Sequence, residues 1–152
     1  MLESQEYQTI LVGTDGSEQA KLAFEKAVAV AKRNDAKIIV AHIIENRVYG
    51  GTMAFSTFSP DVVQEETDNS KDLLAMYKEL AKNLGYENVE TILEFGSPKV
   101  LMAKELPERF NADLIMVGQS GLNAVERLVM GSVSDHIIRT APCDVLVVRP
   151  GS

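Results

Sequence analysis

Residues 10–17 read ILVGTDGS, and this stretch decides the fold class. The apolar run 10–12 ends at a glycine-rich turn, and beyond the turn apolar residues recur at the spacing of a helix with one buried face. Ser17 is placed to cap that helix, because its hydroxyl can accept a hydrogen bond from an amide of the first turn. The stretch therefore predicts a strand, a tight turn and a helix in direct succession. The apolar helical positions are Ala20, Ala23, Phe24, Ala27 and Val30.

The same alternation continues along the chain. Strands alternating with helices are usually parallel and joined by right-handed crossovers. With 152 residues, we expect one domain spanning residues 1–152, an α/β fold built on a doubly wound parallel sheet with helices on both faces. Further strands are predicted at 38–44, 89–95, 114–117 and 145–148, and further helices begin at Pro60, Pro98 and Ser132.

Some local details are also predicted. The helix that begins at Pro60 should run to Leu84 and expose its polar segment 64–72. Pro107 should end or kink the helix in which it lies, because proline removes a backbone donor. Residues 45–59 are rich in Gly, Ser and Thr and are expected to form a loop. The predicted buried stripe of the long helix consists of Leu73, Tyr77, Leu80 and Leu84.

Composition argues against several classes of protein. The formal charge of −7 disfavours general binding to nucleic acid, which depends on lysine and arginine. No apolar run approaches the roughly 20 residues of a membrane span, and the first residues do not resemble a signal peptide, so we expect a cytoplasmic protein without membrane insertion. Cys143 is the single cysteine, which excludes a disulfide within the chain. His42 is expected to be a satisfied core histidine, and His136 lacks the neighbours of a zinc site.

The turns after the strands are the candidate binding elements, because ligands of doubly wound sheets lie beyond the carboxyl ends of the strands. Glycine-rich turns follow the first and fourth strands at 13–17 and 118–121, and Gly131-Ser132 opens the last helix. Glycine lets backbone amides approach a ligand, and a helix start offers unpaired N–H groups and a positive dipole end. This pattern favours the binding of a phosphate group. The spacing alone leaves open a second interpretation, in which the glycines only satisfy turn geometry.

Two common nucleotide motifs are missing from the sequence. No glycine loop ends in Gly-Lys-Ser/Thr, and no Gly-x-Gly-x-x-Gly follows the first strand. A standard P-loop NTPase and an NAD-dependent dehydrogenase are therefore disfavoured.

Residues 111–150 resemble the carboxyl half of the universal stress protein family. The spacing Gly118-x2-Gly121-x9-Gly131-Ser132 fits the glycine signature of the ATP-binding branch of that family. ILVGTDGS at the start and AHII at 41–44 resemble its other landmarks, so the likeness covers nearly the whole chain. It implies a Rossmann-like, adenine nucleotide hydrolase-like fold with five parallel strands in the order 3-2-1-4-5, a homodimer, and ATP bound between the first and fourth strands.

The resemblance also implies roles for individual residues. Asp15 would contact the ribose or adenosine region, although it has a second interpretation as a stabiliser of its own turn. Ile43 would meet the adenine through its backbone, while Gly131, Ser132 and Val133 would hold the phosphates and the adjacent sugar. Gln119 stands where serine is common in the family, and its larger side chain would contact the ligand or crowd it. The expected nucleotide-binding residues are Thr14, Asp15, Ile43, Val117, Gly118, Gln119, Gly121, Gly131, Ser132 and Val133.

These inferences favour an ATP-binding sensor or adaptor in a stress response. ATP would be bound, with or without Mg²⁺, and would not be hydrolysed, because no residue is evidently placed to orient a water. Two alternatives stay open: a slow ATP-hydrolysing switch enzyme, and a nucleotide-free dimeric module that acts through a protein partner. In the implied order the last strand, 145–148, lies at an edge, so we expect it to form a homodimer with a second copy.

Overall fold

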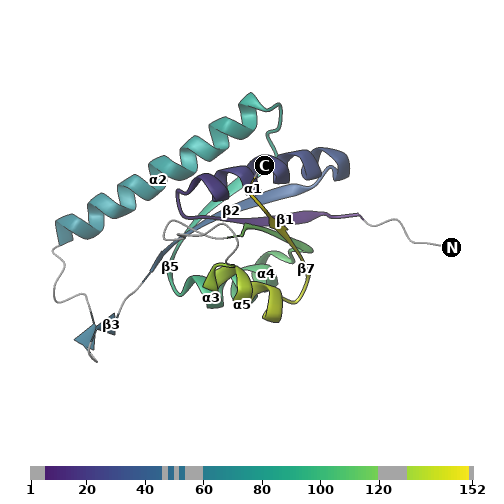
Figure 1. Ribbon diagram of the computed structural model, residues 1–152. Helices are drawn as coiled ribbons and strands as arrows, with labels where there is room; N and C mark the ends of the chain where they lie inside the picture. Colours follow the sequence, from purple (N-terminus) through teal and green to yellow (C-terminus); the bar gives the residue numbers. More distant parts are fainter. Residues whose placement is uncertain (1–5, 46–47, 50–51, 54–59, 120–129, 151–152) are drawn as a thin grey trace.

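The computed structural model describes residues 6–45, 48–49, 52–53, 60–119 and 130–150. One parallel five-stranded sheet forms its centre, in the order β5-β2-β1-β6-β7 (Figure 1). This is the predicted order 3-2-1-4-5, and it is confirmed. The five strands are β1 (Thr9–Thr14), β2 (Lys37–Glu45), β5 (Val89–Gly96), β6 (Leu114–Gly118) and β7 (Asp144–Val148).

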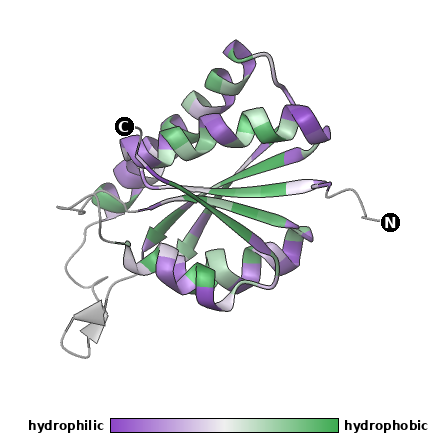
Figure 2. Cartoon of the chain, turned by 45° about the vertical axis from the view of Figure 1, so that its right-hand side comes forward, coloured by the Kyte–Doolittle hydropathy of each residue, from purple (hydrophilic) through white to green (hydrophobic). Residues whose placement is uncertain are grey.

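Helices cover both faces of the sheet, as predicted. Figure 1 shows α1 (Glu18–Asn34) and α2 (Pro60–Asn83) above it, and α3 (Pro98–Val100), α4 (Leu106–Phe110) and α5 (Ser132–Thr140) below it. Alternate residues of each strand point to opposite faces, so the sheet separates two apolar cores, and the strands are largely apolar along their length (Figure 2). The α1–α2 core contains Ile10, Val12, Phe24, Leu114, Met116 and Tyr77. The α5 core contains Leu11, Ile39, Leu106, Ile115, Val117 and Ile137.

The first helix begins and ends as its sequence dictates. The Ser17 hydroxyl accepts from the Ala20 N–H at 3.1 Å, which confirms the predicted cap. At the other end Asp35 adopts a left-handed conformation with φ 54° and donates its N–H to the carbonyl of Ala31, so the chain turns directly into β2.

The buried face of α2 differs from the predicted stripe. Its buried apolar residues are Leu74, Tyr77 and Ala81, whereas Leu84 is exposed. Leu73 and Leu80 are only partly buried. The buried face is rotated about the helix axis relative to the predicted stripe. The sequence pattern did not indicate this because alanine is only weakly apolar, yet Ala81 packs in the α1–α2 core.

The segment 64–72 is also not wholly exposed. Ser70 is buried there, and its hydroxyl donates to the Glu66 carbonyl at 2.9 Å. A serine that satisfies its hydroxyl on its own helix can enter an apolar environment at little cost.

Pro107 does not end its helix, and it lies in α4 directly after an irregular segment. The helical chain continues from Pro98 to Phe110, but its middle is a π-helix, η2 (Leu101–Glu105), and the Leu106 N–H donates to the Leu101 carbonyl five residues back. Proline cannot donate, and its ring crowds the preceding turn, which the wider π turn accommodates. The helix ends only at Asn111, in a left-handed conformation with φ 52°.

The segment 45–59 is only partly described. Two short strands, β3 (Val48–Tyr49) and β4 (Thr52–Met53), form an antiparallel pair where a loop was expected. Ser59, which precedes the first residue of α2 in the sequence, lies outside the described residues. Within the described ranges, no helix is both long and apolar enough to cross a membrane.

Candidate functional site

The sheet reverses its direction of growth at β1, which lies between β2 and β6. The register pairs Thr14, the last residue of β1, with His42. Strand β2 continues beyond that pair, and its residues up to Glu45 have partners only in β5. The backbone around Ile43 therefore extends past the end of β1, at the point where doubly wound sheets bind ligands.

The turn after β1 is built by its own side chains. Asp15 Oδ1 accepts from the Ser17 N–H at 2.9 Å, and Gly16 has φ 83°, a conformation that favours glycine. The Asp15 side chain is exposed. The hydrogen bond from the Ser17 N–H supports the interpretation that Asp15 stabilises its own turn. Contact between Asp15 and a nucleotide stays a prediction.

Thr14 is buried at the end of β1 and is held from two other elements. Its carbonyl lies 2.8 Å from Nδ1 of His42 on β2, which places the ring proton on that nitrogen. Its side chain forms a hydrogen bond with Tyr77 on α2. Thr14 Oγ1 also accepts from the Gly16 N–H in a long bond of 3.4 Å. His42 is therefore a satisfied histidine as expected, although it is half-buried rather than fully buried.

Tyr77 is a neighbour of the site, although its place in the helical pattern predicts only a buried apolar residue. It is 1% exposed and packs edge-to-face on Phe24, with ring centroids 4.9 Å apart. Burial raises the pKa of its hydroxyl, the hydrogen bond with Thr14 opposes that rise, and the nearby acids Asp15, Glu18 and Glu25 add to it. Since Tyr77 and Thr14 are 63 positions apart in the sequence, no local pattern could have indicated the hydrogen bond between them.

The turn after β6 brings the chain close to α1. A Cβ on Gly118 would lie 3.1 Å from both Cβ and the carbonyl oxygen of Gln19. Packing against α1 therefore accounts for this glycine. The next residue, Gln119, is 4% exposed and donates its N–H to the Val148 carbonyl at 3.0 Å.

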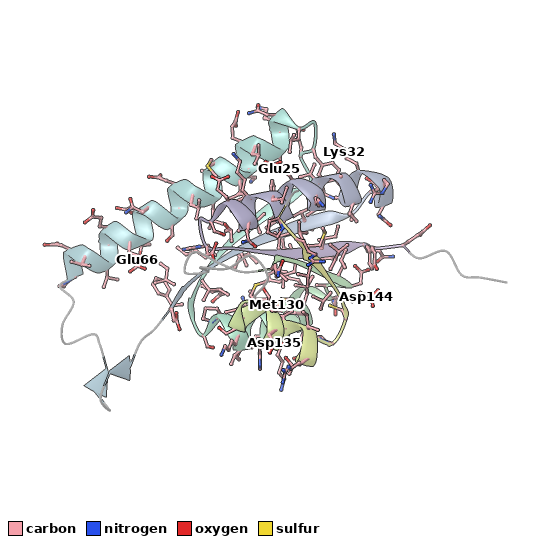
Figure 3. The ribbon with its side chains drawn as sticks, in the orientation of Figure 1. Glu25, Lys32, Glu66, Met130, Asp135 and Asp144 are labelled. Carbon is pink, nitrogen blue, oxygen red and sulfur yellow. The ribbon has the colours of Figure 1, made fainter. Side chains whose placement is uncertain are left out.

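The start of α5 is tied to the end of β6 by two hydrogen bonds. The Gly131 N–H donates to the Gln119 carbonyl at 2.8 Å, and Ser134 Oγ donates to the Gly118 carbonyl at 2.7 Å. Gly131 is the N-cap and supplies no side-chain acceptor. The first bond within the helix runs from the Asp135 N–H to Gly131, so the amides of residues 132–134 have no acceptor in the helix. Figure 3 shows Met130 and Asp135 on either side of this helix start.

The remaining predicted site residues fall into different environments. Ser132 is exposed at the helix start, and Val133 packs partly into the α5 core. The Val117 side chain is buried in the same core, so only its backbone can line a site. Gly121 of the glycine signature lies outside the described residues.

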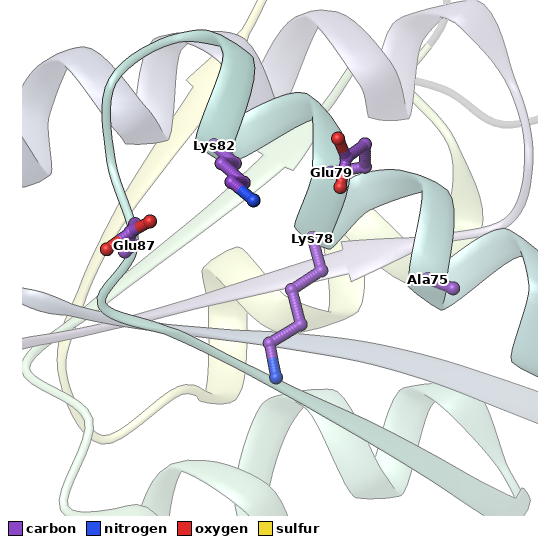
Figure 4. Close-up of a pocket in the computed structure, with 5 residues that line it drawn as sticks. All are labelled: Ala75, Lys78, Glu79, Lys82 and Glu87. Carbon is purple, nitrogen blue, oxygen red and sulfur yellow. The ribbon is translucent and has the colours of Figure 1, made fainter.

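Two further features lie away from these turns. A shallow cavity of about 390 Å³ is lined by Ala75, Lys78, Glu79, Lys82 and Glu87 (Figure 4). Glu87 precedes β5, so this cavity lies toward the starting ends of the strands, opposite the turns described above. In the described part of the chain, no three His, Cys, Asp or Glu side chains gather as a metal site would require. Burial raises the pKa of the Cys143 thiol, and Asp144 and Asp113 raise it further.

Comparison with known proteins identifies the family. The model of the universal stress protein family matches residues 6–149, almost the whole chain. The chain belongs to the universal stress protein family. A universal stress protein of Staphylococcus saprophyticus is 52% identical over 143 residues, covering 94% of this chain and 84% of the relative. One from Staphylococcus aureus strain USA300 is 50% identical over the same length and with the same coverage.

Solved structures of the family share the fold. The UspA protein of Lactobacillus plantarum superimposes with a TM-score of 0.85 at 27% identity, covering 96% of this chain and all of that one. A universal stress protein crystallised in complex with cAMP gives a TM-score of 0.74 at 28% identity, covering 97% of this chain and 100% of that one. The five-stranded parallel architecture is thus that of its structural relatives.

Proposed function

We propose that this universal stress protein binds ATP and acts as a nucleotide-dependent sensor or adaptor in a stress response. The observation that carries the proposal is the start of α5, where the amides of residues 132–134 have no acceptor in the helix and are fixed beside the end of β6. Three such amides together with the helix dipole suit an anionic group. A phosphate placed there would also be within reach of the exposed Ser132 hydroxyl.

The rest of the crevice fits the other parts of a nucleotide. The backbone of Ile43 extends beyond β1 on β2 and would contact the adenine, while Asp15 would face the ribose or adenosine. The base would then lie beyond the carboxyl end of β2, the sugar would cross the ends of β1 and β6, and the phosphates would reach the start of α5. The relative bound to cAMP, itself an adenine nucleotide, supports this ligand class.

We propose binding rather than turnover. Hydrolysis needs a residue that orients water and groups that neutralise the phosphates. Asp15 is the carboxylate in the β1 turn, and its Oδ1 already accepts from the Ser17 N–H. Mg²⁺ would find its oxygen ligands on the phosphates themselves. In the sensor model, bound ATP orders the turns around the crevice and so changes a surface that a protein partner recognises.

A homodimer through β7 completes the proposal. Strand β7 is at the edge of the sheet, and its Leu146 is 38% exposed. Ile138 on the neighbouring α5 is also exposed, at 46%. An open apolar edge recruits another strand, and two-fold pairing of identical edges closes it.

The decisive experiment is to identify the ligand of the native protein. Protein purified without added nucleotide would be denatured, and the released small molecules would be analysed by mass spectrometry. We expect an adenine nucleotide, and we expect calorimetric binding of ATP to the stripped protein. Absence of both would exclude the nucleotide-dependent function and favour the nucleotide-free module.

A further inference from the structure

Gln119 carries a buried hydrogen-bond acceptor that the fold leaves unused. Its backbone is fully engaged, because its N–H donates to Val148 and its carbonyl accepts from Gly131. Its side chain is 96% buried, and Oε1 has no hydrogen-bond partner in the structure as described. A buried polar atom without a partner destabilises a protein, and such atoms are rare enough to call for an explanation.

The strand geometry indicates on which side of the sheet this side chain lies. Val117 packs into the α5 core, and the Cβ position of Gly118 faces Gln19 on α1. The bond from Gln119 to Val148 continues the ladder between β6 and β7. Alternation along the strand therefore returns the Gln119 side chain to the face covered by α5.

We infer that Gln119 Oε1 accepts a hydrogen bond from a ribose hydroxyl of the ligand and makes the site select ribonucleotides over deoxynucleotides. This inference rests on the proposed nucleotide binding. Gln119 follows the end of β6, which is the neighbour of β1 in the sheet, and its carbonyl accepts from Gly131 at the start of α5, which would hold the phosphates. The sugar is the part of a nucleotide that crosses this position.

The chemistry of the ligand supports the same assignment. Phosphate oxygens are acceptors at neutral pH and cannot satisfy another acceptor. The adenine amino group can donate, but in the proposed arrangement it lies at the end of β2, on the far side of β1. The ribose hydroxyls are the donors that remain. A site built to bond a hydroxyl discriminates strongly against the analogue that lacks it, because its own polar group is then left unpaired.

The test combines one variant with three ligands. Gln119→Leu keeps nearly the same volume and removes the amide, and calorimetry would measure ATP, 2′-deoxyATP and 3′-deoxyATP on both proteins. We expect wild type to bind one deoxy analogue about tenfold more weakly than ATP, and Gln119→Leu to bind all three with nearly equal affinity. Gln119→Glu, which keeps an acceptor, should retain the preference even if its charge weakens binding of every nucleotide.

A ligand-free measurement separates this role from a structural one. Removing the unpaired buried Oε1 should raise the melting temperature of the stripped protein by about 2–4 °C, whereas an amide whose oxygen stabilised the fold would make Gln119→Leu melt lower. The exposed Gln64→Leu is the control, and it should change neither the ligand preference nor the melting temperature appreciably.

Three results would overturn the inference: equal binding of the three ligands by wild type, an unchanged preference in Gln119→Leu, or a lower melting temperature of that variant. Failure of wild type to bind any adenine nucleotide would instead overturn the proposed function, and the inference with it.

Discussion

A proline at position 132 offers a direct test of the phosphate site. Ser132 is the first residue of α5, and no hydrogen bond from its N–H is found among the described residues. The preceding Gly131 has φ −64° and ψ 152°, the extended conformation that a residue before proline prefers. The chain already begins α2 with Pro60 and α3 with Pro98. Ser132→Pro should therefore leave the helix intact and delete one amide donor.

The magnitude follows from the bond that is lost. A hydrogen bond to a charged group contributes about 1.5–3 kcal/mol, which corresponds to roughly 10- to 150-fold in Kd. Ser132→Ala is the matched control, because it removes the hydroxyl and keeps the amide. We expect Ser132→Pro to bind ATP roughly 10- to 150-fold more weakly than Ser132→Ala, by calorimetry on the stripped proteins.

Adenosine supplies the second control, because it has no phosphate. Its affinity should be the same for Ser132→Pro and Ser132→Ala, and the two melting temperatures without ligand should agree within a few degrees. Equal ATP binding by the two variants, with both folded, would refute the placement of phosphate on the α5 amides. A matching loss of adenosine binding would show that the proline had disturbed the crevice instead.

Three other predictions follow from the contacts. Tyr77→Phe should lower the free energy of unfolding by about 0.5–1.5 kcal/mol in urea denaturation; because the folded pKa of Tyr77 is raised above 10.0, wild-type stability should also fall as the pH rises beyond 10, more steeply than that of the variant. Leu146→Lys should convert a sedimenting dimer into a monomer while leaving the melting temperature nearly unchanged, and a wild-type monomer at micromolar concentration would contradict the β7 interface. Gly118→Ala should destabilise the fold by about 1–3 kcal/mol through its clash with α1, whereas Gly13→Ala, which meets only the flexible end of a methionine, should cost less.

The fold was predictable because its signals are local. Strands β1, β2, β6 and β7 are short, mainly apolar runs, and the Ser17 cap depends on residues three positions apart. The same local signals misjudged α2, where Ala81 and Ser70 are buried although neither reads as strongly apolar. They also missed the π-helix before Pro107, which arises where the proline ring crowds a helix that packing holds in place.

The candidate site was predictable only in outline. The turn at 13–17 and the start of the turn at 118–119 were located from glycines and strand ends, and the family resemblance predicted their roles. The hydrogen bond between Thr14 and Tyr77, and the bond between Thr14 and His42, join elements far apart in the chain. The unpaired Oε1 of Gln119 depends on what the fold places around it, and no spacing of residues encodes that.

Residues in and around the glycine signature are of two kinds: those that the fold itself requires, and those whose polar groups are available to a ligand. Gly118 is required by its approach to α1, and Ser134 donates to the Gly118 carbonyl. These two residues would be needed in the fold even without a ligand. Ser132 exposes a hydroxyl, and neither that hydroxyl nor its amide has a hydrogen bond among the described residues, while Oε1 of Gln119 is buried without one. The proposed ribonucleotide would present an anion to Ser132 and a hydroxyl donor to Gln119. The ligand discrimination of Gln119 and the proline at 132 therefore test different parts of one molecule.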